Sequence, residues 1–422
     1  ILHSFFYKEN VCIFDKLIII NLEAIYMKVL KPFYYDEFKC IADKCIDNCC
    51  HIQWRITIDE KTYKKYRKLK GPWGKKINNN ITRIRKNNSY LSYGKIKLKD
   101  CGCSLLDEDG LCSIHAQLGE EYLSNTCKVY PRDISKYNNI YERNLLMSCP
   151  EVARYLIKHK DDFYFNMDEE ELSDLDKDYI VNKICDKNLY NLLWDARSLT
   201  MKIIQFKEIE IWKRIVLSKI LCDKVQVIIN EKDYENYQSL LNNFKNEIVN
   251  VDTIKSLDKI TIVPGIKMSF TQTILQLRNN CGIKNEKYLK LIDEYNELVE
   301  KNNSGILMIE IENEFNKFLS QHNNVLENLL VYLIYKYFMR ALYTKNLEVE
   351  ISNMIISYAV IKMLLLTRWY KNNKILNEED FVEVFYVFSR VIEHSNGFLC
   401  ILYNNIKYAG YDSVAYMTIL VR

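Results

Sequence analysis

The sequence predicts a mainly α-helical protein with a cysteine-rich N-terminal part, and three observations support this prediction. The 422-residue chain has only 11 Gly and 5 Pro, which is typical of helix-rich proteins with few tight turns. From about residue 156 onward, apolar residues recur at three- and four-residue spacing. Of the 14 cysteines, ten lie within the first 150 residues.

Residues 1–26 are expected to be a translated leader upstream of the true start, Met27. The codons of Leu22 to Ala24 can contain GGAGG, a bacterial ribosome-binding sequence, at a suitable distance before that methionine. The nearby stretch KLIIINL is short, has acidic residues on both sides and lacks a small-residue cleavage site, so it does not fit an export signal. A short ordered arm is the alternative interpretation of this segment. We therefore expect a cytoplasmic protein.

Residues 27–155 are predicted to form a cysteine-cluster domain of short helices and loops. The stretch TIDEKTYKKYRKLK predicts one helix, with Thr57 or Asp59 as its N-terminal cap, and SIHAQLGEEYL predicts a second. Residues 76–100 alternate loosely, as in a hairpin, and DEDG at 107–110 is typical of a solvated turn.

Residues 156–422 are predicted to form an all-helical domain. Its most apolar windows, LLVYLIYKYFMRAL and MIISYAVIKMLLLT, contain Lys336, Arg340 and Lys362 and are therefore expected to be buried helices rather than membrane spans. The formal net charge of +4 is too small a bias to indicate nucleic acid as a partner.

The clustered cysteines indicate a metal site. In a reducing compartment, dense cysteines are more typical of metal binding than of disulfides. Thiolates are the preferred ligands of iron–sulfur clusters and of structural zinc, and ligands on short loops lower the entropic cost of assembly. The spacings differ from a tandem CxxC zinc ribbon, which favours iron–sulfur over zinc. The isolated cysteines are expected to be small hydrophobes: Cys12, Cys185, Cys222, Cys281 and Cys400.

Three motifs carry a family resemblance: FKCIADKCIDNCCHIQWRITIDEKTYKKY, CSLLDEDGLCSIHAQLGEEYLSNTCKVYPR and LMSCPEVAR. Together they resemble the bacterial flagellin lysine-N-methylase family, within the wider group of CxxCC-type zinc- or iron-chelating proteins. Two helical segments, ARSLTMKIIQFKEIEIWKRI and RVIEHSNGFL, resemble the family more weakly. The resemblance implies a [4Fe-4S] cluster, S-adenosylmethionine as methyl donor, and surface lysines of flagellin as substrate.

The resemblance also implies a set of metal ligands, which is larger than one cluster needs. A cluster uses four thiolates, so the eight matching cysteines leave the choice of four open. Cys101 lies one step off the family element and is not included. The matching residues are Cys40, Cys45, Cys49, Cys50, Cys103, Cys112, Cys127 and Cys149.

Methyl transfer needs a neutral lysine amine, so a base must remove a proton or desolvation must lower the lysine pKa. No catalytic base is assigned from the sequence. Asp59 is more typical of a helix cap, and the acidic run is more typical of a turn. The residues considered were Asp59, Asp107, Glu108, Asp109, Tyr122 and Tyr130.

Other polar and aromatic residues near the motifs have two interpretations each. His51 and His115 are expected to support the cysteine ligands rather than to bind metal. Trp54 is expected in a core and Arg132 in a salt bridge, with pocket lining as the alternative for both and for Tyr130. A further group either joins helices or contacts the donor: Arg197, Gln205 and Arg214.

Two functions are compatible with these features. The first is lysine N-methylation, favoured by the family resemblance and by the long helical part. The second is a non-catalytic iron- or zinc-binding protein that serves in redox sensing, metal storage or as a structural site. The chain has no glycine-rich donor-binding motif, and Ile52 stands where a CxxxCxxC motif would have its third cysteine. The donor site is therefore left unassigned.

Overall fold

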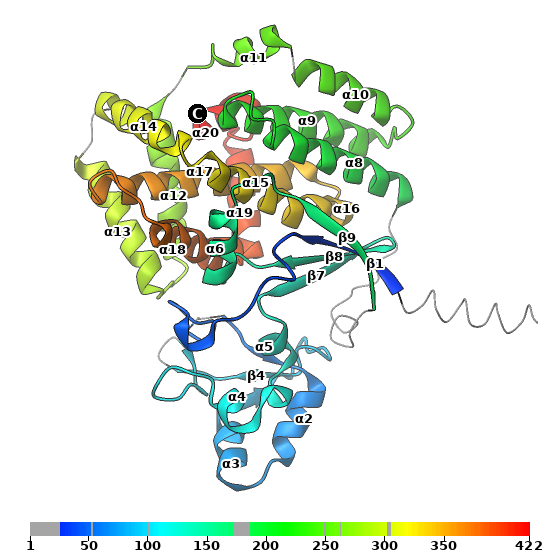
Figure 1. The fold of residues 1–422 in the computed structure, drawn as a ribbon, viewed down its shortest axis with the longest axis vertical. Helices are drawn as coiled ribbons and strands as arrows, with labels where there is room; N and C mark the ends of the chain where they lie inside the picture. The colour runs from blue at the N-terminus through cyan, green and yellow to red at the C-terminus, as the bar shows by residue number, and fades with distance from the viewer. Residues whose placement is uncertain are drawn as a thin grey trace, which may run out of the picture.

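The computed structural model describes residues 26–51, 54–99, 102–171, 186–248, 250–261, 263–301 and 305–422. The protein has a small head, which we define as residues 40–130, below a larger helical body (Figure 1). The predicted leader lies outside the described residues, apart from Tyr26. Met27 belongs to the first strand.

The head combines short helices with short strands. Asp59 caps α2 as predicted, because its carboxylate accepts the N–H groups of Thr62 at 2.8 Å and of Asn125 at 3.0 Å. The second predicted head helix is wrong in part: α4 ends at Leu118, before Gly119, whose φ of +87° suits glycine, and η2 follows. The elements are η1 (Ala42–Lys44), β2 (Thr57–Ile58), α2 (Glu60–Lys68), α3 (Gly71–Asn80), β3 (Ile81–Arg83), β4 (Gly94–Ile96), β5 (Leu98–Lys99), β6 (Gly102–Cys103), α4 (Ser113–Leu118), η2 (Glu120–Tyr122) and α5 (Asn125–Val129).

A four-stranded sheet, which the sequence did not predict, joins the head to the body (Figure 1). Its order is β7-β8-β1-β9, in which β1 is parallel to β8 and antiparallel to β9. The acidic strand β9 is stabilised there because Lys31 of β1 pairs with Asp168 at 3.0 Å and with Glu170 at 2.5 Å. The strands are β1 (Tyr26–Pro32), β7 (Arg132–Tyr137), β8 (Ile140–Leu145) and β9 (Phe165–Glu171).

The body is helical, which confirms the predicted mainly α class. Helix α6 crosses the predicted domain boundary at 155, and that boundary stays a prediction. The helices are α6 (Pro150–Lys158), α8 (Lys187–Ile204), α9 (Ile211–Glu231), α10 (Tyr237–Ile248), α11 (Val251–Leu257), α12 (Pro264–Asn279), α13 (Glu286–Lys301), α14 (Gly305–Ser320), α15 (Asn323–Tyr337), η3 (Phe338–Arg340), α16 (Ala341–Thr344), α17 (Leu347–Lys371), α18 (Glu378–Phe388), the π-helix η4 (Ser389–Glu393), α19 (Asn396–Tyr408) and α20 (Val414–Val421).

Helix α17 forms the centre of the body (Figure 1). It is the one helix within the described ranges that is long and apolar enough to cross a membrane, but 89% of its apolar window is buried inside the protein. Neighbouring helices α9, α13, α15, α18 and α20 pack around it. The helix therefore has the environment of a core helix, as the sequence predicted for this window.

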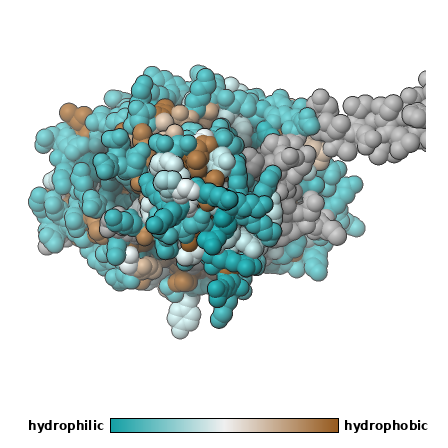
Figure 2. Space-filling model, turned by 90° about the horizontal axis from the view of Figure 1, so that it is seen from below, coloured by the Kyte–Doolittle hydropathy of each residue, from teal (hydrophilic) through white to brown (hydrophobic). Residues whose placement is uncertain are grey.

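Buried ion pairs connect these layers. Arg197 of α8 forms a two-pronged pair with Glu142 of β8, at 2.7 and 2.5 Å. Arg214 of α9 pairs with Glu327 of α15 at 2.7 Å. On the face of the head end seen in Figure 2, hydrophobic side chains are scattered among hydrophilic ones.

Candidate active site between the head and the body

A hollow of about 680 Å³ lies where the head meets the body. From the head it is lined by Asp47, His51 and Trp54, and from the body by Arg390 and His394. A second hollow of about 560 Å³ adjoins it, because Asp47, His51 and Lys287 line both. We refer to the two hollows together as the cleft.

Backbone and side-chain contacts bring the separate cysteine motifs together in the head. The N–H of Cys103 donates to the carbonyl of Cys50 at 2.8 Å, which joins the first motif to the second. The hydroxyls of Thr57 and Thr126 are 2.7 Å apart and connect β2 to α5, which carries Cys127. Residues far apart in the sequence thus share one small core.

The eight matching cysteines fall into two groups by the core they contact. Buried Cys103 belongs to the head core, and Cys50, Cys112 and Cys127 pack against it. We call these four the head-core cysteines. The other four, which we call the cleft-side cysteines, lie outside that core: Cys149 packs against the body core, Cys45 lines the second hollow, and Cys40 and Cys49 are exposed.

The head-core cysteines fit a thiolate-bound metal by their chemistry, because four soft sulfur donors lie in or against one small hydrophobic core. Among the described residues, no three Cys, His, Asp or Glu side chains are already arranged as a metal-binding group. Metal binding in the head, and the identity of the ligands, therefore stay predictions.

The thiols differ in how their surroundings affect ionisation. A hydrogen bond from Cys50, with a further contribution from the positive charge of Arg390, lowers the pKa of Cys49 to about 7. Burial raises the pKa of Cys103 to about 11 and that of Cys127 to about 12. Burial also raises the pKa of Cys45, and it raises that of Cys149 to about 12, so Cys49 alone of these three cleft-side thiols has a lowered pKa.

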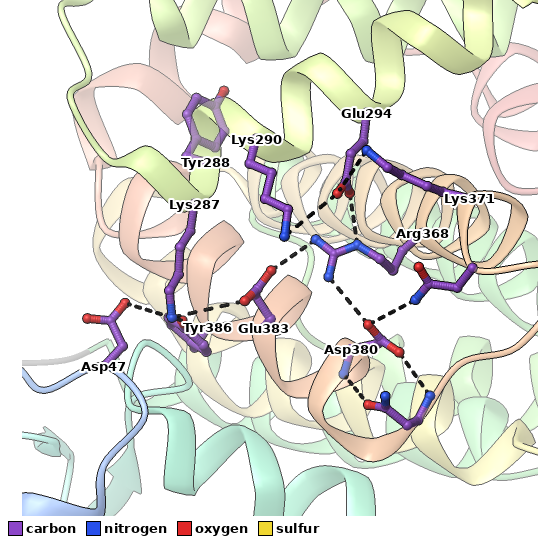
Figure 3. Close-up of polar contacts among 12 residues, drawn as sticks. Asp47, Lys287, Tyr288, Lys290, Glu294, Arg368, Lys371, Asp380, Glu383 and Tyr386 are labelled. Atoms are coloured by element: carbon purple, nitrogen blue, oxygen red, sulfur yellow. Dashed lines mark hydrogen bonds and ion pairs between the residues drawn. The ribbon is translucent and has the colours of Figure 1, made fainter.

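Asp47 and Arg390 hold the head against the body at the cleft. The guanidinium Nη1 of buried Arg390 lies 2.8 Å from Oδ2 of Asp47, and its Nη2 donates to the Asp47 carbonyl at 2.6 Å. Lys287 of α13 approaches the same carboxylate at 3.7 Å and donates to Tyr386 Oη at 2.6 Å, as Figure 3 shows.

A chain of polar groups lies beside this contact. His394 Nε2 is 2.7 Å from Ser148 Oγ, which is in turn 3.0 Å from the hydroxyl of Tyr130. The ring of Trp54 makes edge contacts with His394 and Tyr130, with ring centroids 5.1 and 5.3 Å apart. The histidine thus lies at the wall of the cleft with one ring nitrogen oriented by a buried hydroxyl.

His394 is neutral at physiological pH. Burial, with the positive charge of Lys336 as the second cause, lowers its pKa to about 4. Lys336 is held by the buried carboxylate of Glu393, with Nζ at 2.6 Å from Oε1, and Tyr337 donates to the same oxygen at 2.7 Å. The π-helix η4 carries Glu393 into this network, and π-helical turns often occur at functional sites.

Several residues singled out in the sequence have structural roles. Arg214 joins two helices through Glu327, which was one of its two predicted roles. Arg197 instead joins α8 to strand β8 through Glu142, and Gln205 donates to the Phe163 carbonyl at 2.9 Å. Asp59 accepts two backbone N–H groups in a buried position, so it serves as a cap.

The remaining candidates divide between cleft and surface. Trp54 packs against the head core, as expected, and it also lines the cleft, which was its alternative role. The guanidinium of Arg132 lies over the Phe38 ring at 5.6 Å, and among the residues that the structure describes it has no carboxylate partner for the expected salt bridge. Asp107 Oδ1 accepts the N–H of Leu111 at 2.7 Å, which confirms the predicted turn. Asp109 lines the second hollow.

The cleft residues that the sequence analysis missed include Asp47, Lys287, Arg390 and His394. The stretch VFYVFSRVIEHS did contain a signal, because an arginine and a glutamate within an otherwise apolar helical run indicate a buried polar network. The sequence around Asp47 contains no such signal, because Asp47 is one of several polar residues between the cysteines.

Comparison with known proteins shows which family the chain resembles. Residues 197–420 match the model of the FliB lysine N-methylase C-terminal domain. The chain is 38% identical over 136 residues to the flagellar biosynthetic protein FliU of Salmonella muenchen, which covers 32% of this chain and 79% of that protein. It is 37% identical over 136 residues to lysine-N-methylases of Salmonella typhimurium and Salmonella choleraesuis, spanning 33% of their length. No solved structure matches the chain.

Proposed function

This chain belongs to the FliB lysine N-methylase family, and on that premise we propose that it methylates lysine side chains of flagellin in the cleft, with S-adenosylmethionine as donor. One observation carries the placement. Segments that resemble the family in different parts of the chain meet there: Trp54 from the first cysteine motif, Ser148 beside the last, and His394 from RVIEHSNGFL. We propose a cytoplasmic location and neither a membrane nor a nucleic-acid partner.

The second hollow suits the acceptor lysine. Its wall includes Asp43, Asp47 and Asp109, whose carboxylates attract an ammonium group, and the apolar side chains of Ile46 and Leu111, which suit the lysine methylenes. Cationic side chains, including Arg278 and Lys287, line the larger hollow and suit the carboxylate of the donor's methionine part.

The acceptor amine must lose a proton to present its lone pair. When bound, the donor supplies a methyl group on a sulfonium, and the amine nitrogen forms the new bond to carbon as the carbon–sulfur bond breaks. His394 is the group at the cleft wall placed to accept the proton, with its ring oriented by Ser148. Its pKa of about 4 makes it a weak base, so the transfer also requires a lowered pKa of the bound amine. Lys336 and Arg390, near this histidine, disfavour the charged form of a neighbouring amine.

We further propose that the head-core cysteines hold the iron–sulfur cluster, with zinc as the alternative metal. A cluster there would supply a redox-active iron centre and a rigid link between three loops of the head. Cys103 and Cys127, whose thiols are buried, would need to lose their protons on loading, so metal uptake should release protons.

The test starts with protein purified without oxygen and analysed for iron, sulfide and zinc. Iron and sulfide in equal amounts, at about four per chain, would support a single cubane cluster. The loaded protein is then incubated with S-adenosylmethionine and purified flagellin, and lysine methylation is mapped by mass spectrometry. Bound metal without methylation of flagellin would favour the alternative of a non-catalytic metal-binding protein.

Variants separate the proposed roles at the cleft. His394→Gln should lower kcat by about 100-fold, as expected when a general base is lost, with little change in KM. Asp109→Asn should instead raise the KM for flagellin and leave the KM for the donor unchanged, because it removes attraction for the acceptor alone. Unchanged kinetics in both variants would place the reaction outside this cleft.

A further inference from the structure

One guanidinium contacts both cysteine-bearing segments at the junction of head and body. Arg390 lies on η4, and its side chain is 1% exposed. Toward the first segment it makes the ion pair with Asp47 and donates to the Asp47 carbonyl. Toward the second it donates from Nε to the carbonyl of Ser148 at 2.8 Å. Asp47 lies between Cys45 and Cys49, and Ser148 precedes Cys149.

The arginine is itself held in place by the body. Its guanidinium lies over the ring of Tyr386 at 4.7 Å, one turn earlier in α18. Lys287, which donates to the Tyr386 hydroxyl, also faces Glu383 at 4.0 Å. Figure 3 shows how this chain continues from Glu383 to Arg368 at 2.9 Å. The contact of Arg390 with the cysteine loop is therefore supported by a network of charged and aromatic side chains in the helical body.

From these contacts we propose that Arg390 is a positioning residue for the cleft-side cysteines. It fixes the loop that carries Cys45 and Cys49 through Asp47, and it fixes Cys149 through the Ser148 carbonyl. The ordering of these thiols, and the retention of metal by the cysteines of the head, then depend on the C-terminal helix that carries Arg390. This inference rests on the proposed function and extends it: the metal site in the N-terminal head depends on Arg390 from the C-terminal half of the chain.

The geometry requires arginine specifically. Three nitrogens of one planar group reach a carboxylate oxygen and two backbone carbonyls that belong to two separate segments. Lysine has a single nitrogen on a flexible stem and cannot occupy all three positions in a fixed plane. Hence Arg390→Lys keeps the positive charge near the cleft but loses the link between the two segments.

The test uses Arg390→Lys, Arg390→Gln and Asp47→Asn, with Arg214→Gln as a matched control. Arg214 is also a buried arginine that touches a carboxylate, Glu327, and a backbone carbonyl, but it lies in the body away from the cysteines. Two readouts are made on the full chain. Metal-free protein is labelled with iodoacetamide and the rate at each cysteine is followed by mass spectrometry, and anaerobically loaded protein is analysed for iron and sulfide.

We expect Arg390→Lys to label Cys45, Cys49 and Cys149 about tenfold faster than the parent protein, because the contacts that order both segments are lost. Asp47→Asn should accelerate labelling of Cys45 and Cys49 but not of Cys149, because the contact of Arg390 with Ser148 remains. In Arg390→Gln the gain at Cys49 should be smaller, because the positive charge that favours its thiolate is also lost. Labelling of Cys103 in the head core should not change, whereas bound iron should fall because Cys50, one of the proposed head-core ligands, directly follows Cys49 on the loosened loop. Arg214→Gln should lower the thermal midpoint without altering the labelling pattern.

Wild-type labelling and iron content in all three variants would overturn the proposal. So would equal acceleration at Cys103, since that pattern reports general unfolding of the head. Asp47→Asn keeps the body network of Arg390 intact and therefore remains informative if the Arg390 variants do not fold. The labelling readout needs neither flagellin nor a cluster, so it stays decisive even where the parent protein proves to have no methylase activity.

Discussion

Two buried lysines in the body should respond in opposite ways to loss of their charge. Lys362 of α17 is buried and donates to the Val421 carbonyl at 3.3 Å, and within the described part of the chain it forms no ion pair with a carboxylate. Burial, with the nearby charge of Lys267 as the second cause, lowers its pKa to about 7. Lys267 is also buried, but it pairs with Glu312 at 2.8 Å.

The pKa shift of Lys362 sets the sign and size of its effect. Between pH 7 and 10.5 the unfolded chain binds a proton at this lysine that the folded protein does not, so the free energy of unfolding rises with pH across this window. A shift of this size corresponds to about 4 kcal/mol at pH 7, reduced by about 1 kcal/mol for the lost hydrogen bond. Lys362→Met should therefore stabilise the protein by about 2–4 kcal/mol at pH 7.

Urea unfolding of the parent protein and both variants, measured in steps from pH 7 to pH 10, tests this. The stabilisation by Lys362→Met should shrink toward zero as the pH approaches 10.5. Lys267→Met should instead lower the free energy of unfolding by about 3–5 kcal/mol, because it leaves the Glu312 carboxylate buried without its partner. A destabilised Lys362→Met protein, or a gain that does not change with pH, would refute the reasoning.

Three further substitutions are predicted from other buried polar groups. Asp59→Ala should lower the free energy of unfolding by about 1–3 kcal/mol, because α2 loses its N-terminal cap and the N–H of Asn125 loses its acceptor. At a temperature where the variant is folded, its kcat should be unchanged. Glu142→Ala should cost about 3–5 kcal/mol in urea unfolding by leaving Arg197 buried and unpaired. Burial raises the pKa of Glu350 to about 7, so between pH 4.5 and 7 the folded protein binds a proton that the unfolded chain does not. The free energy of unfolding therefore falls as the pH rises through this window, and Glu350→Gln should remove that fall.

Local signals in the sequence predicted the helices well because the physical cause of each is local. The cap at Asp59 and the apolar spacing of the body helices depend on residues within one or two turns. The sheet was missed because its strands pair over long sequence separations. Strand β9 reads as an acidic run, and its stability depends on Lys31 and Arg143 from β1 and β8. No local pattern contains that information.

The sequence named candidate thiols, whose role as metal ligands stays a prediction, but it did not show how they are arranged. The cysteine spacing named the thiols, but their division into head-core and cleft-side groups follows from which core each segment packs against. Arg390 and Asp47 are 343 residues apart in the sequence and meet through the packing of α18 and η4 on the head. A buried arginine in an apolar helix indicates that a carboxylate or carbonyl pairs with it, but the sequence does not identify that group.

The size of the head affects how loss of function should be interpreted. Its hydrophobic core contains nine buried residues, Ile56, Ile58, Tyr66, Ile77, Ile81, Ile96, Cys103, Leu105 and Ile114, and domains with so small a core are commonly stabilised by a metal or by a larger neighbour. The head-core cysteines would supply the first kind of support, and the contacts of Arg390 supply the second. A substitution at a head-core cysteine therefore removes a metal ligand and a structural support at once. Loss of methylation in such a variant would show that the head must be intact, whereas a kcat loss in His394→Gln, with metal content and thermal midpoint unchanged, would locate the chemistry.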